Sequence, residues 1–342
     1  MHPPAATDPT MRAILLDGPG APAELSARRV PAPVAAAGEA VVAVEAAAVN
    51  RSDVLNAIGL PITSYPRVPG RDFAGVVVDG PADLLGSRCW GTGSGDLGFS
   101  RDGSHAERLA VPVAALLPLP ATMSLEQAGA AGLSYLVAHD GLSKAGLGDE
   151  PDQAVLVTGA AGGVGAAAAA LVRWRGARLL AAVLDERERD VVLAAHPEAS
   201  VVVSGEQPLP EAVAAATDGK GADVVYDTVG NPVFADAVAS LAEGGRMVVI
   251  TAVPGAEAPF DLFGFYRRSA VLLTANTTRF DSSWAGGLLR ELLPGFESGA
   301  LPPPRIAEEV ALEDCADAYQ AVQEGRPGRV VLRCANEEGS VD

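Results

Sequence analysis

The pattern of apolar residues divides the chain into segments of two kinds. Between residues 11 and 119, short apolar runs alternate with clusters of proline and glycine, and these runs are Arg12–Leu16, Ala40–Val44, Phe73–Val78 and Arg108–Val111. Runs of this length between turn-forming residues are typical of antiparallel β-structure. Ser52–Ile58 differs, because Asn50 or Ser52 can serve as the N-cap of a short helix. The pattern of residues 11–119 therefore predicts a β-rich half-barrel.

After about residue 124, apolar strands alternate with stretches of helical length. The predicted strands are Ala154–Thr158, Arg178–Val183, Ser200–Val203, Asp223–Asp227 and Arg246–Thr251. The predicted helices are Gly163–Arg175, Glu186–Ala195, Leu209–Thr217 and Pro232–Leu241. This alternation builds parallel βαβ units with right-handed crossovers. We therefore predict a doubly wound parallel sheet of the Rossmann type.

The end of the chain returns to short elements, with a helix predicted at Leu312–Glu324 and a strand at Arg329–Arg333. We expect them to rejoin the first region, which gives an α/β fold with the Rossmann sheet inserted in a split, β-rich domain. A chain of 342 residues has the length of about two domains. The predicted division is a split domain of residues 11–125 and 290–334, a Rossmann domain of residues 126–289, and disordered tails at 1–10 and 335–342.

Charge and cysteine content narrow the class of protein. Acidic residues outnumber basic ones 43 to 25, and a net charge of −18 repels phosphate backbones, so we expect no nucleic-acid partner. The three cysteines are too few for a disulfide framework, which favours the cytoplasm. The first ten residues do not resemble a secretory signal. Ala154–Val172 is uncharged and long, but its four glycines argue against a membrane span.

The strongest chemical signal is Val155–Gly165, a strand followed by a glycine-rich turn and a helix. Gly162 and Gly165 occupy two positions of the usual glycine motif, whereas Ala160 replaces its first glycine. Free N–H groups at such a helix start hold the pyrophosphate of a dinucleotide, and a plain tight turn is the alternative. The residues predicted to bind the cofactor here are Ala160, Ala161, Gly162, Gly163, Val164 and Gly165.

The end of the second strand bears on which dinucleotide binds. Leu184 is not acidic, but Asp185 follows Gly165 by 20 residues and keeps NADH possible. Arg187 and Arg189 can pair with a 2′-phosphate, which favours NADPH. The alternative is that both arginines are solvated charges on a helix face.

Taken together, Val49–Gly59, Pro69–Val77, Asp102–Val111, the glycine turn and Asp227–Gly230 resemble the medium-chain dehydrogenase/reductase superfamily. The similarity is greatest to its zinc-independent quinone oxidoreductase and enoyl reductase branch. The resemblance implies a GroES-like half-barrel beside the Rossmann domain, and it adds Val229 and Gly230 to the cofactor site. It also implies a homodimer, formed near Val248–Thr251 and Leu272–Thr274.

Several positions depart from the patterns of relatives. Where zinc-dependent relatives place their metal ligands, this chain has Asn50, Arg71 followed by Asp72, and about Ala130, so no zinc is expected. Leu55 and Pro61 occupy positions where related reductases have tyrosines. Tyr65 is then the candidate proton donor, and a half-buried packing residue is the alternative.

Two further site residues follow from the resemblance. Asn50 is expected to reach the nicotinamide ribose or the substrate, unless it only caps a helix. Ser134 matches a threonine that contacts the nicotinamide carboxamide, and a buried hydroxyl bonded to backbone is its alternative.

The predicted activity is NADPH-dependent reduction of a quinone or an α,β-unsaturated carbonyl compound, with no nucleic-acid or membrane partner. An enoyl reductase acting on thioesters of acyl carrier protein or coenzyme A is the first alternative. It requires a basic entrance, for which the candidates are Arg67, Arg71, Arg267, Arg268 and Arg279. A relative that binds the cofactor without turnover is the second alternative.

Overall fold

The computed structural model describes residues 9–59, 63–252 and 255–335, which form two compact units. Unit 1 contains the chain up to Leu133, residues 278–299 and the chain from Pro303; unit 2 contains residues 134–277 and 300–302. The tails predicted at 1–10 and 335–342 lie largely outside the described residues. Residues 126–133 and 278–289, which the sequence assigns to the Rossmann domain, belong to unit 1, and residues 300–302, assigned to the split domain, belong to unit 2.

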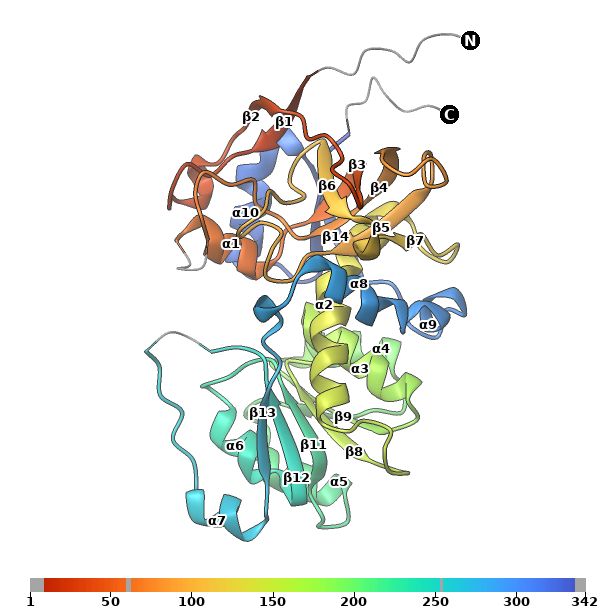
Figure 1. The fold of residues 1–342 in the computed structure, drawn as a ribbon. Coiled ribbons are helices and arrows are strands. Elements are labelled where there is room, and N and C mark those ends of the chain that lie inside the picture. The colour runs from red at the N-terminus through yellow and green to blue at the C-terminus, as the bar shows by residue number, and fades with distance from the viewer. Residues whose placement is uncertain (1–8, 60–62, 253–254, 336–342) are drawn as a thin grey trace. The chain divides into compact units, whose positions relative to one another are not determined.

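Unit 1 is built on a seven-stranded sheet with the order β14-β15-β3-β4-β5-β7, in which β6 also pairs with β3 (Figure 1). Its strands are β3 (Glu39–Ala48), β4 (Asp72–Asp79), β5 (Arg88–Thr92), β6 (Arg108–Pro112), β7 (Leu117–Pro118), β14 (Ile306–Ala311) and β15 (Arg329–Arg333). Only β14 and β15 pair in parallel; the other pairs are antiparallel. A separate ribbon joins β1 (Thr10–Ile14) to β2 (Ala27–Pro31).

The core of unit 1 joins segments from both ends of the chain. Phe73 of β4 and Tyr319 of α10 (Cys315–Gln323) are both fully buried in it. Leu332 of β15 lies opposite Ala47 of β3 in an antiparallel pair. Strand β3 can pair on both sides because most of its residues are small or β-branched and buried. The C-terminal elements therefore complete the sheet that the N-terminal segment begins.

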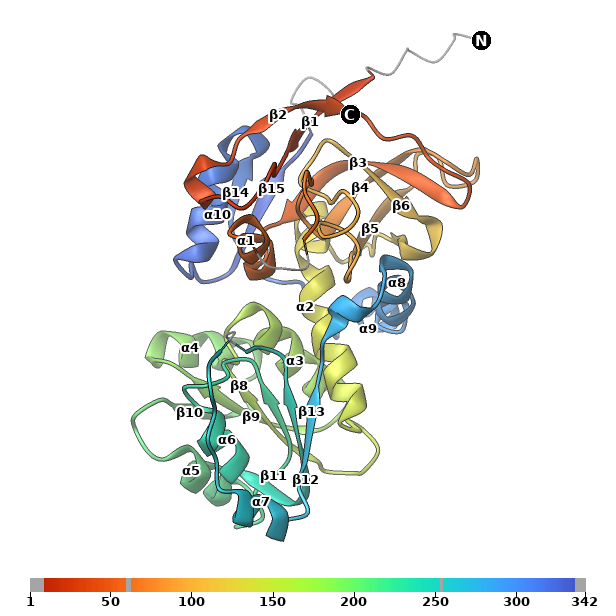
Figure 2. The same cartoon turned by 60° about the vertical axis from the view of Figure 1, so that its left-hand side comes forward.

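Unit 2 confirms the doubly wound parallel sheet. Its six strands have the order β10-β9-β8-β11-β12-β13, and all are parallel (Figure 2). They are β8 (Ala154–Thr158), β9 (Arg178–Val183), β10 (Ser200–Val203), β11 (Ala222–Asp227), β12 (Leu241–Val249) and β13 (Val271–Thr274). The direction of winding reverses between β8 and β11, where such folds bind ligands beyond the carboxyl ends of the strands.

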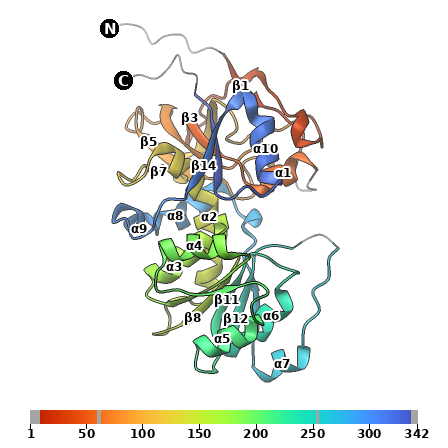
Figure 3. The same cartoon turned by 180° about the vertical axis from the view of Figure 1, so that it is seen from behind.

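Helices cover both faces of this sheet (Figure 3). On one face, α5 (Leu209–Ala216) and α6 (Phe234–Ala239) bury Val213 and Phe234 against the strands. On the other, the Tyr226 hydroxyl donates to Val137 O in α2 (Leu125–Lys144) over 2.8 Å. The strands are apolar on both sides, as parallel strands between helix layers require. None of the helices in the described ranges is long and apolar enough to cross a membrane.

Several elements differ from the predictions. Leu241, predicted to end a helix, begins β12, so α6 is shorter than expected. The sequence pattern also missed α2, α7 (Leu262–Arg267), α8 (Ser282–Arg290) and α9 (Leu293–Glu297). Helix α8 lies in unit 1 because the Asp96 carboxylate accepts hydrogen bonds from Ser282 N and Oγ, over 2.9 and 2.7 Å.

Candidate functional site

The turn between β8 and α3 (Gly163–Trp174) is tight and leaves the helix start open. Gly159 has a φ of +61°, and Gly162 N donates to its carbonyl oxygen over 3.0 Å. A Cβ on Gly165 would lie 2.1 Å from that oxygen, so the close approach of helix and strand requires glycine there. Gly162, the exposed N-cap, has no side chain to bond the first turn. The N–H groups that begin α3 can therefore hold an anion such as a pyrophosphate.

The residues predicted to bind the pyrophosphate are not equivalent. Ala160 is 1% exposed, and its N–H donates to Ala182 O of β9 over 3.2 Å. Ala161 and Val164 are half-buried, whereas Gly162 and Gly163 are exposed. Ala160 therefore fixes the turn to the sheet, and the exposed glycines form the surface that a ligand can approach.

A cavity of about 850 Å³ opens at the carboxyl ends of the strands, and Gly159 of the turn forms part of its wall. Leu184 lines it after β9, Ser204 after β10, and Val229 after β11. The volume lies in the range of pockets for nucleotide-sized ligands. The glycine turn and the cavity together fit a dinucleotide.

The loop after β11 is held by a buried carboxylate. Asp227 is fully buried, and its Oδ1 accepts hydrogen bonds from Thr158 Oγ1 over 2.6 Å and from Val229 N and Gly230 N over 3.1 Å each. Thr228 Oγ1 donates to Thr158 O over 2.7 Å. The predicted cofactor residues Val229 and Gly230 are thus fixed beside the glycine turn. Asp227 was predicted only as part of a segment that carries the family resemblance, and not as a site residue.

The end of β9 places the charged candidates differently from the expectation. Asp185 is the N-cap of α4 (Glu186–Ala195), and its Oδ1 accepts from Glu188 N over 3.0 Å. Arg187 is exposed and makes no hydrogen bond or ion pair within the described chain. Arg189 Nη1 lies 2.8 Å from Glu186 Oε1. Glu188, which lines the cavity, was not among the predicted site residues, although its spacing from the N-cap Asp185 was an available signal.

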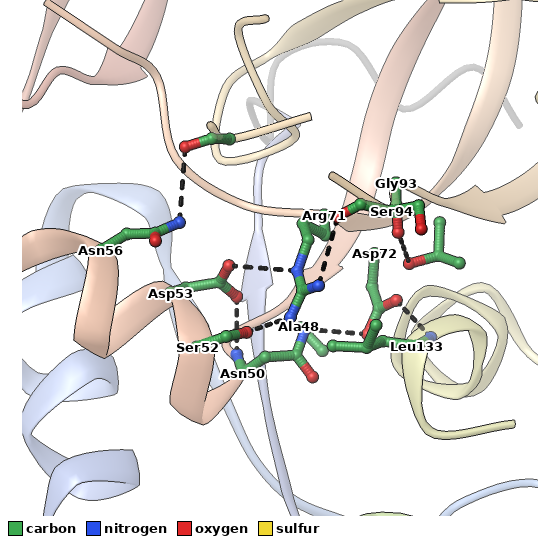
Figure 4. Close-up of polar contacts among 12 residues, drawn as sticks. Ala48, Asn50, Ser52, Asp53, Asn56, Arg71, Asp72, Gly93, Ser94 and Leu133 are labelled. Carbon is green, nitrogen blue, oxygen red and sulfur yellow. Dashed lines mark hydrogen bonds and ion pairs between the residues drawn. The ribbon is translucent and has the colours of Figure 1, made fainter. Parts of the chain in front are cut away.

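In unit 1, Asn50 belongs to a buried polar network (Figure 4). Its Nδ2 donates to Asp72 Oδ2 over 3.0 Å, and its Oδ1 accepts from Arg329 Nη2 over 2.7 Å. Asp72 Oδ1 accepts from Leu133 N over 2.7 Å. Asn50 stands at the N-cap of α1 (Arg51–Ala57), but its side chain makes no capping bond; the Asp53 carboxylate accepts from Asn50 N instead. The side chain is therefore held in one orientation by Asp72 and Arg329.

Arg71 is the second arginine of this network, and it is buried. Figure 4 shows its guanidinium between Ser52, Asp53 and Ser94. It donates to Ser52 Oγ and, over 3.4 Å, to Ser94 O, while its Nε lies 3.9 Å from Asp53 Oδ1. Burial lowers the pKa of Arg71, and the nearby carboxylates of Asp53 and Asp72 oppose that shift. The two acids of the network are thus matched by the buried guanidinium of Arg71 and the half-buried one of Arg329.

This set of side chains does not fit zinc. The positions that match metal ligands in relatives hold an amide, a guanidinium and a carboxylate that already accepts three hydrogen bonds. Ala130, at the third position, is an apolar residue of α2. Among the described residues, no group of three or more histidine, cysteine, aspartate or glutamate side chains is placed to hold a metal ion. Zinc needs three or four nitrogen, thiolate or carboxylate ligands, and these positions supply a single carboxylate, which is already used as a hydrogen-bond acceptor.

The remaining catalytic candidates lie in different surroundings. Tyr65 is half-buried against the core of unit 1, and its hydroxyl donates to Asn56 O over 2.8 Å. Burial raises the pKa of Tyr65. Ser134 is 3% exposed and belongs to unit 2, whereas Asn50 and Tyr65 belong to unit 1. Leu55 is 40% exposed, and Pro61 lies outside the described residues.

Comparison with known proteins agrees with these features. Residues 36–121 match the family model described as alcohol dehydrogenase GroES-like domain, and residues 163–293 match the one described as zinc-binding dehydrogenase. A zinc-type alcohol dehydrogenase-like protein of Schizosaccharomyces pombe is 33% identical over 297 residues, which cover 85% of this chain and 86% of that protein. An acryloyl-coenzyme A reductase of Metallosphaera sedula is 29% identical, covering 89% of this chain and 95% of that protein.

A solved structure described as NAD-dependent alcohol dehydrogenase is 29% identical, with a TM-score of 0.85, covering 95% of this chain and 100% of that chain. Proteins named quinone oxidoreductase also align with about four-fifths of this chain. The chain therefore belongs to the medium-chain dehydrogenase/reductase superfamily, in its quinone oxidoreductase branch. It is an oxidoreductase of the kind that uses a nicotinamide cofactor.

Proposed function

We propose that this chain is a zinc-independent reductase that transfers a hydride from nicotinamide C4 to a quinone or an α,β-unsaturated carbonyl compound. The observation that carries the proposal is the open start of α3 beside a cavity of nucleotide size. A nicotinamide dinucleotide bound there supplies the hydride. The N–H groups of Gly163 to Gly165 hold its pyrophosphate, and Asp227 keeps the neighbouring loop in place.

Asn50 has a chemically defined part in this proposal. Because its Oδ1 accepts from Arg329 and one Nδ2 hydrogen goes to Asp72, the side chain has one N–H left to donate. A donor suits a ribose hydroxyl or the oxygen of an enolate that forms when a conjugated carbonyl accepts hydride. Ser134 is proposed to contact the nicotinamide carboxamide. Tyr65 was the proton donor predicted from the sequence, but its hydroxyl already donates to Asn56 O, so we propose a packing role for it and leave the proton donor unassigned.

The two alternatives predict different acceptors. An enoyl thioester of coenzyme A or acyl carrier protein is supported by the similarity to an acryloyl-coenzyme A reductase. A cofactor-binding protein without turnover is supported by Leu55 and Tyr65, since the first replaces a tyrosine of related reductases and the second is bonded to backbone. The sequence favours NADPH, with NADH as the alternative.

A homodimer and a cytoplasmic location complete the proposal. Strand β13 forms one edge of the unit 2 sheet, and its Val271 and Leu272 are 43% and 44% exposed. A second copy can pair with this edge. Val248 belongs to β12, which lies between β11 and β13, so it does not stand at the edge. Light scattering of Leu272→Lys against the unmodified chain tests the dimer.

The three cysteines are buried and unpaired, in keeping with a reducing compartment.

The test of the activity measures binding and turnover separately. Purified protein is titrated with NADH and NADPH by fluorescence, and then nicotinamide absorbance is followed with quinones, enones and enoyl thioesters. We expect binding and reduction of at least one conjugated acceptor without added zinc. Binding without reduction of any acceptor supports the alternative without turnover, and absence of binding contradicts the proposed site.

Two variants at the start of α3 test the pyrophosphate site: Gly162→Asp is the test variant, and Gly162→Ala is its matched control. Gly162→Asp places a carboxylate beside the proposed pyrophosphate, while Asp is a favourable N-cap for α3. We expect a loss of affinity of about 100-fold or more for both dinucleotides, with an unchanged melting temperature. Gly162→Ala, whose Cβ lies 3.3 Å from Gly159 O, adds no charge and should cost much less affinity.

A further inference from the structure

We propose that Glu188 binds the adenosine ribose of the dinucleotide and makes the site selective for NADH over NADPH. The inference rests on the proposed function, because it assumes that the dinucleotide occupies the cavity of unit 2. It departs from the sequence-based preference for NADPH. It also assigns the ribose contact to a residue other than Asp185.

The wall of the cavity is acidic. Three acidic side chains line it, namely Glu188, Glu206 and Asp236, of which Glu206 lies 3.6 Å from Arg189 Nη1 and is partly neutralised. Within the described chain, no arginine or lysine lines it. NADPH differs from NADH by a phosphate on the adenosine ribose, and a second anion among these carboxylates is repelled unless a cation stands between them. The wall therefore favours the dinucleotide that lacks this phosphate.

The two arginines that favour NADPH in the sequence do not line the cavity. Arg189 Nη1 is 2.8 Å from Glu186 Oε1 and 3.6 Å from Glu206 Oε1, so its charge is shared by two carboxylates. Arg187 is exposed and is not among the residues that line the cavity. Both arginines fit the alternative of solvated helix-face charges. A 2′-phosphate would have to draw Arg189 away from both of its partners.

The carboxylate of Glu188 is held at the end of β9. Its Oε2 accepts from Leu184 N over 2.8 Å, which fixes the carboxylate at the residue that follows β9. Its Oε1 accepts no hydrogen bond from a described residue. In doubly wound folds the adenosine ribose lies at the end of this strand, where an acidic side chain accepts its hydroxyls. Asp185 Oδ1 is used as the cap of α4, and Asp185 does not line the cavity.

The experiment measures dissociation constants by calorimetry, without turnover. The ligands are NADH, NADPH and the fragments ADP and 2′,5′-ADP, and the proteins are the native chain, Glu188→Gln and Asp236→Asn. We expect the native chain to bind NADH at least about tenfold more tightly than NADPH, and ADP more tightly than 2′,5′-ADP. Glu188→Gln should reduce this preference about tenfold, mainly by weakening NADH.

The variants are chosen so that folding does not decide the result. A glutamine at 188 still offers an oxygen to Leu184 N, and the melting temperature checks that the fold is kept. Asp236→Asn removes a charge from the same wall at α6, so we expect it to change the NADH preference less than Glu188→Gln does. An equal effect of both variants would mean that only the general field acts, and would overturn the role of Glu188.

Two other outcomes separate this inference from the proposed function. Tighter binding of NADPH than of NADH by the native chain overturns the inference and leaves dinucleotide binding intact. If Arg187→Ala then removes the preference for NADPH, Arg187 binds the 2′-phosphate of NADPH. Binding of neither dinucleotide contradicts the proposed function itself.

Discussion

Asp72 receives hydrogen bonds from three distant parts of the chain. Asn50 and Arg329 donate to its Oδ2 over 3.0 and 3.3 Å, and Leu133 N donates to its Oδ1 over 2.7 Å. The carboxylate is fully buried, so no water can replace a lost partner. Asp72 thus determines the orientation of Asn50 and balances the charge of Arg329.

Replacing this carboxylate should therefore be costly. Asp72→Ala leaves a buried guanidinium without its anion and is expected to lower the free energy of unfolding by about 3–5 kcal/mol. Urea unfolding followed by the fluorescence of buried Trp90 measures the change. Asp17→Ala is the control, because Asp17 pairs with Arg28 at the surface and should contribute no more than about 1 kcal/mol. Equal losses in the two variants would show that the buried network contributes little.

Tyr65 tests whether its hydroxyl serves catalysis or packing. The hydroxyl donates to Asn56 O, and burial raises its pKa, so proton donation requires breaking that bond and ionising a weaker acid. We expect Tyr65→Phe to retain kcat within about threefold, because a general acid contributes about 100-fold or more when it acts. The same variant should lose about 1 kcal/mol of stability through the missing hydrogen bond. A 100-fold fall in kcat at unchanged dinucleotide affinity would identify Tyr65 as the donor.

At the scale of elements, α8 offers two adjacent glycines in opposite surroundings. A Cβ on Gly286 would lie 2.2 Å from Ala114 O, whereas one on Gly287 meets nothing within 4 Å. Gly286→Ala should destabilise by about 1–3 kcal/mol through overpacking. Gly287→Ala should stabilise by about 0.5–1 kcal/mol, because alanine loses less entropy in a helix. Thermal unfolding compares the two, and stabilisation by both substitutions would mean that Gly286 does not pack against Ala114.

The predictability of each element depended on how local its signal is. The strands β8 to β11 followed from apolar runs between helical stretches, and the glycine turn followed from its spacing. Helix α8 was missed although Asp281 is its N-cap, because Gly286 and Gly287 weaken its helical pattern. Its packing could not be predicted, since Asp96 is 186 residues away in sequence from Ser282. Arg329 was missed as a site residue for the same reason, since it reaches Asn50 across 279 residues. Glu188 had a local signal in its spacing from the N-cap Asp185, but only the structure shows that it lines the cavity.

At the scale of the whole molecule, the net charge of −18 sets how anionic substrates approach. An enoyl-coenzyme A needs a basic entrance to overcome this field. Two of its five candidate arginines do not offer one: Arg71 is buried between carboxylates, and Arg67 pairs with Asp102 over 3.0 Å. The field is therefore expected to oppose coenzyme A thioesters and to leave neutral quinones unaffected.

Ionic strength separates these cases, because the Debye length falls from about 30 Å at 0.01 M salt to about 10 Å at 0.1 M. With saturating dinucleotide, kcat/KM for an enoyl-coenzyme A should rise several-fold over this range. It should stay level for a neutral quinone and for the uncharged pantetheine thioester, which is the matched control. A fall for the coenzyme A thioester alone would mean that a local basic surface outweighs the overall charge. That result would favour the thioester reductase over the quinone reductase, since such a surface has no use toward a neutral substrate.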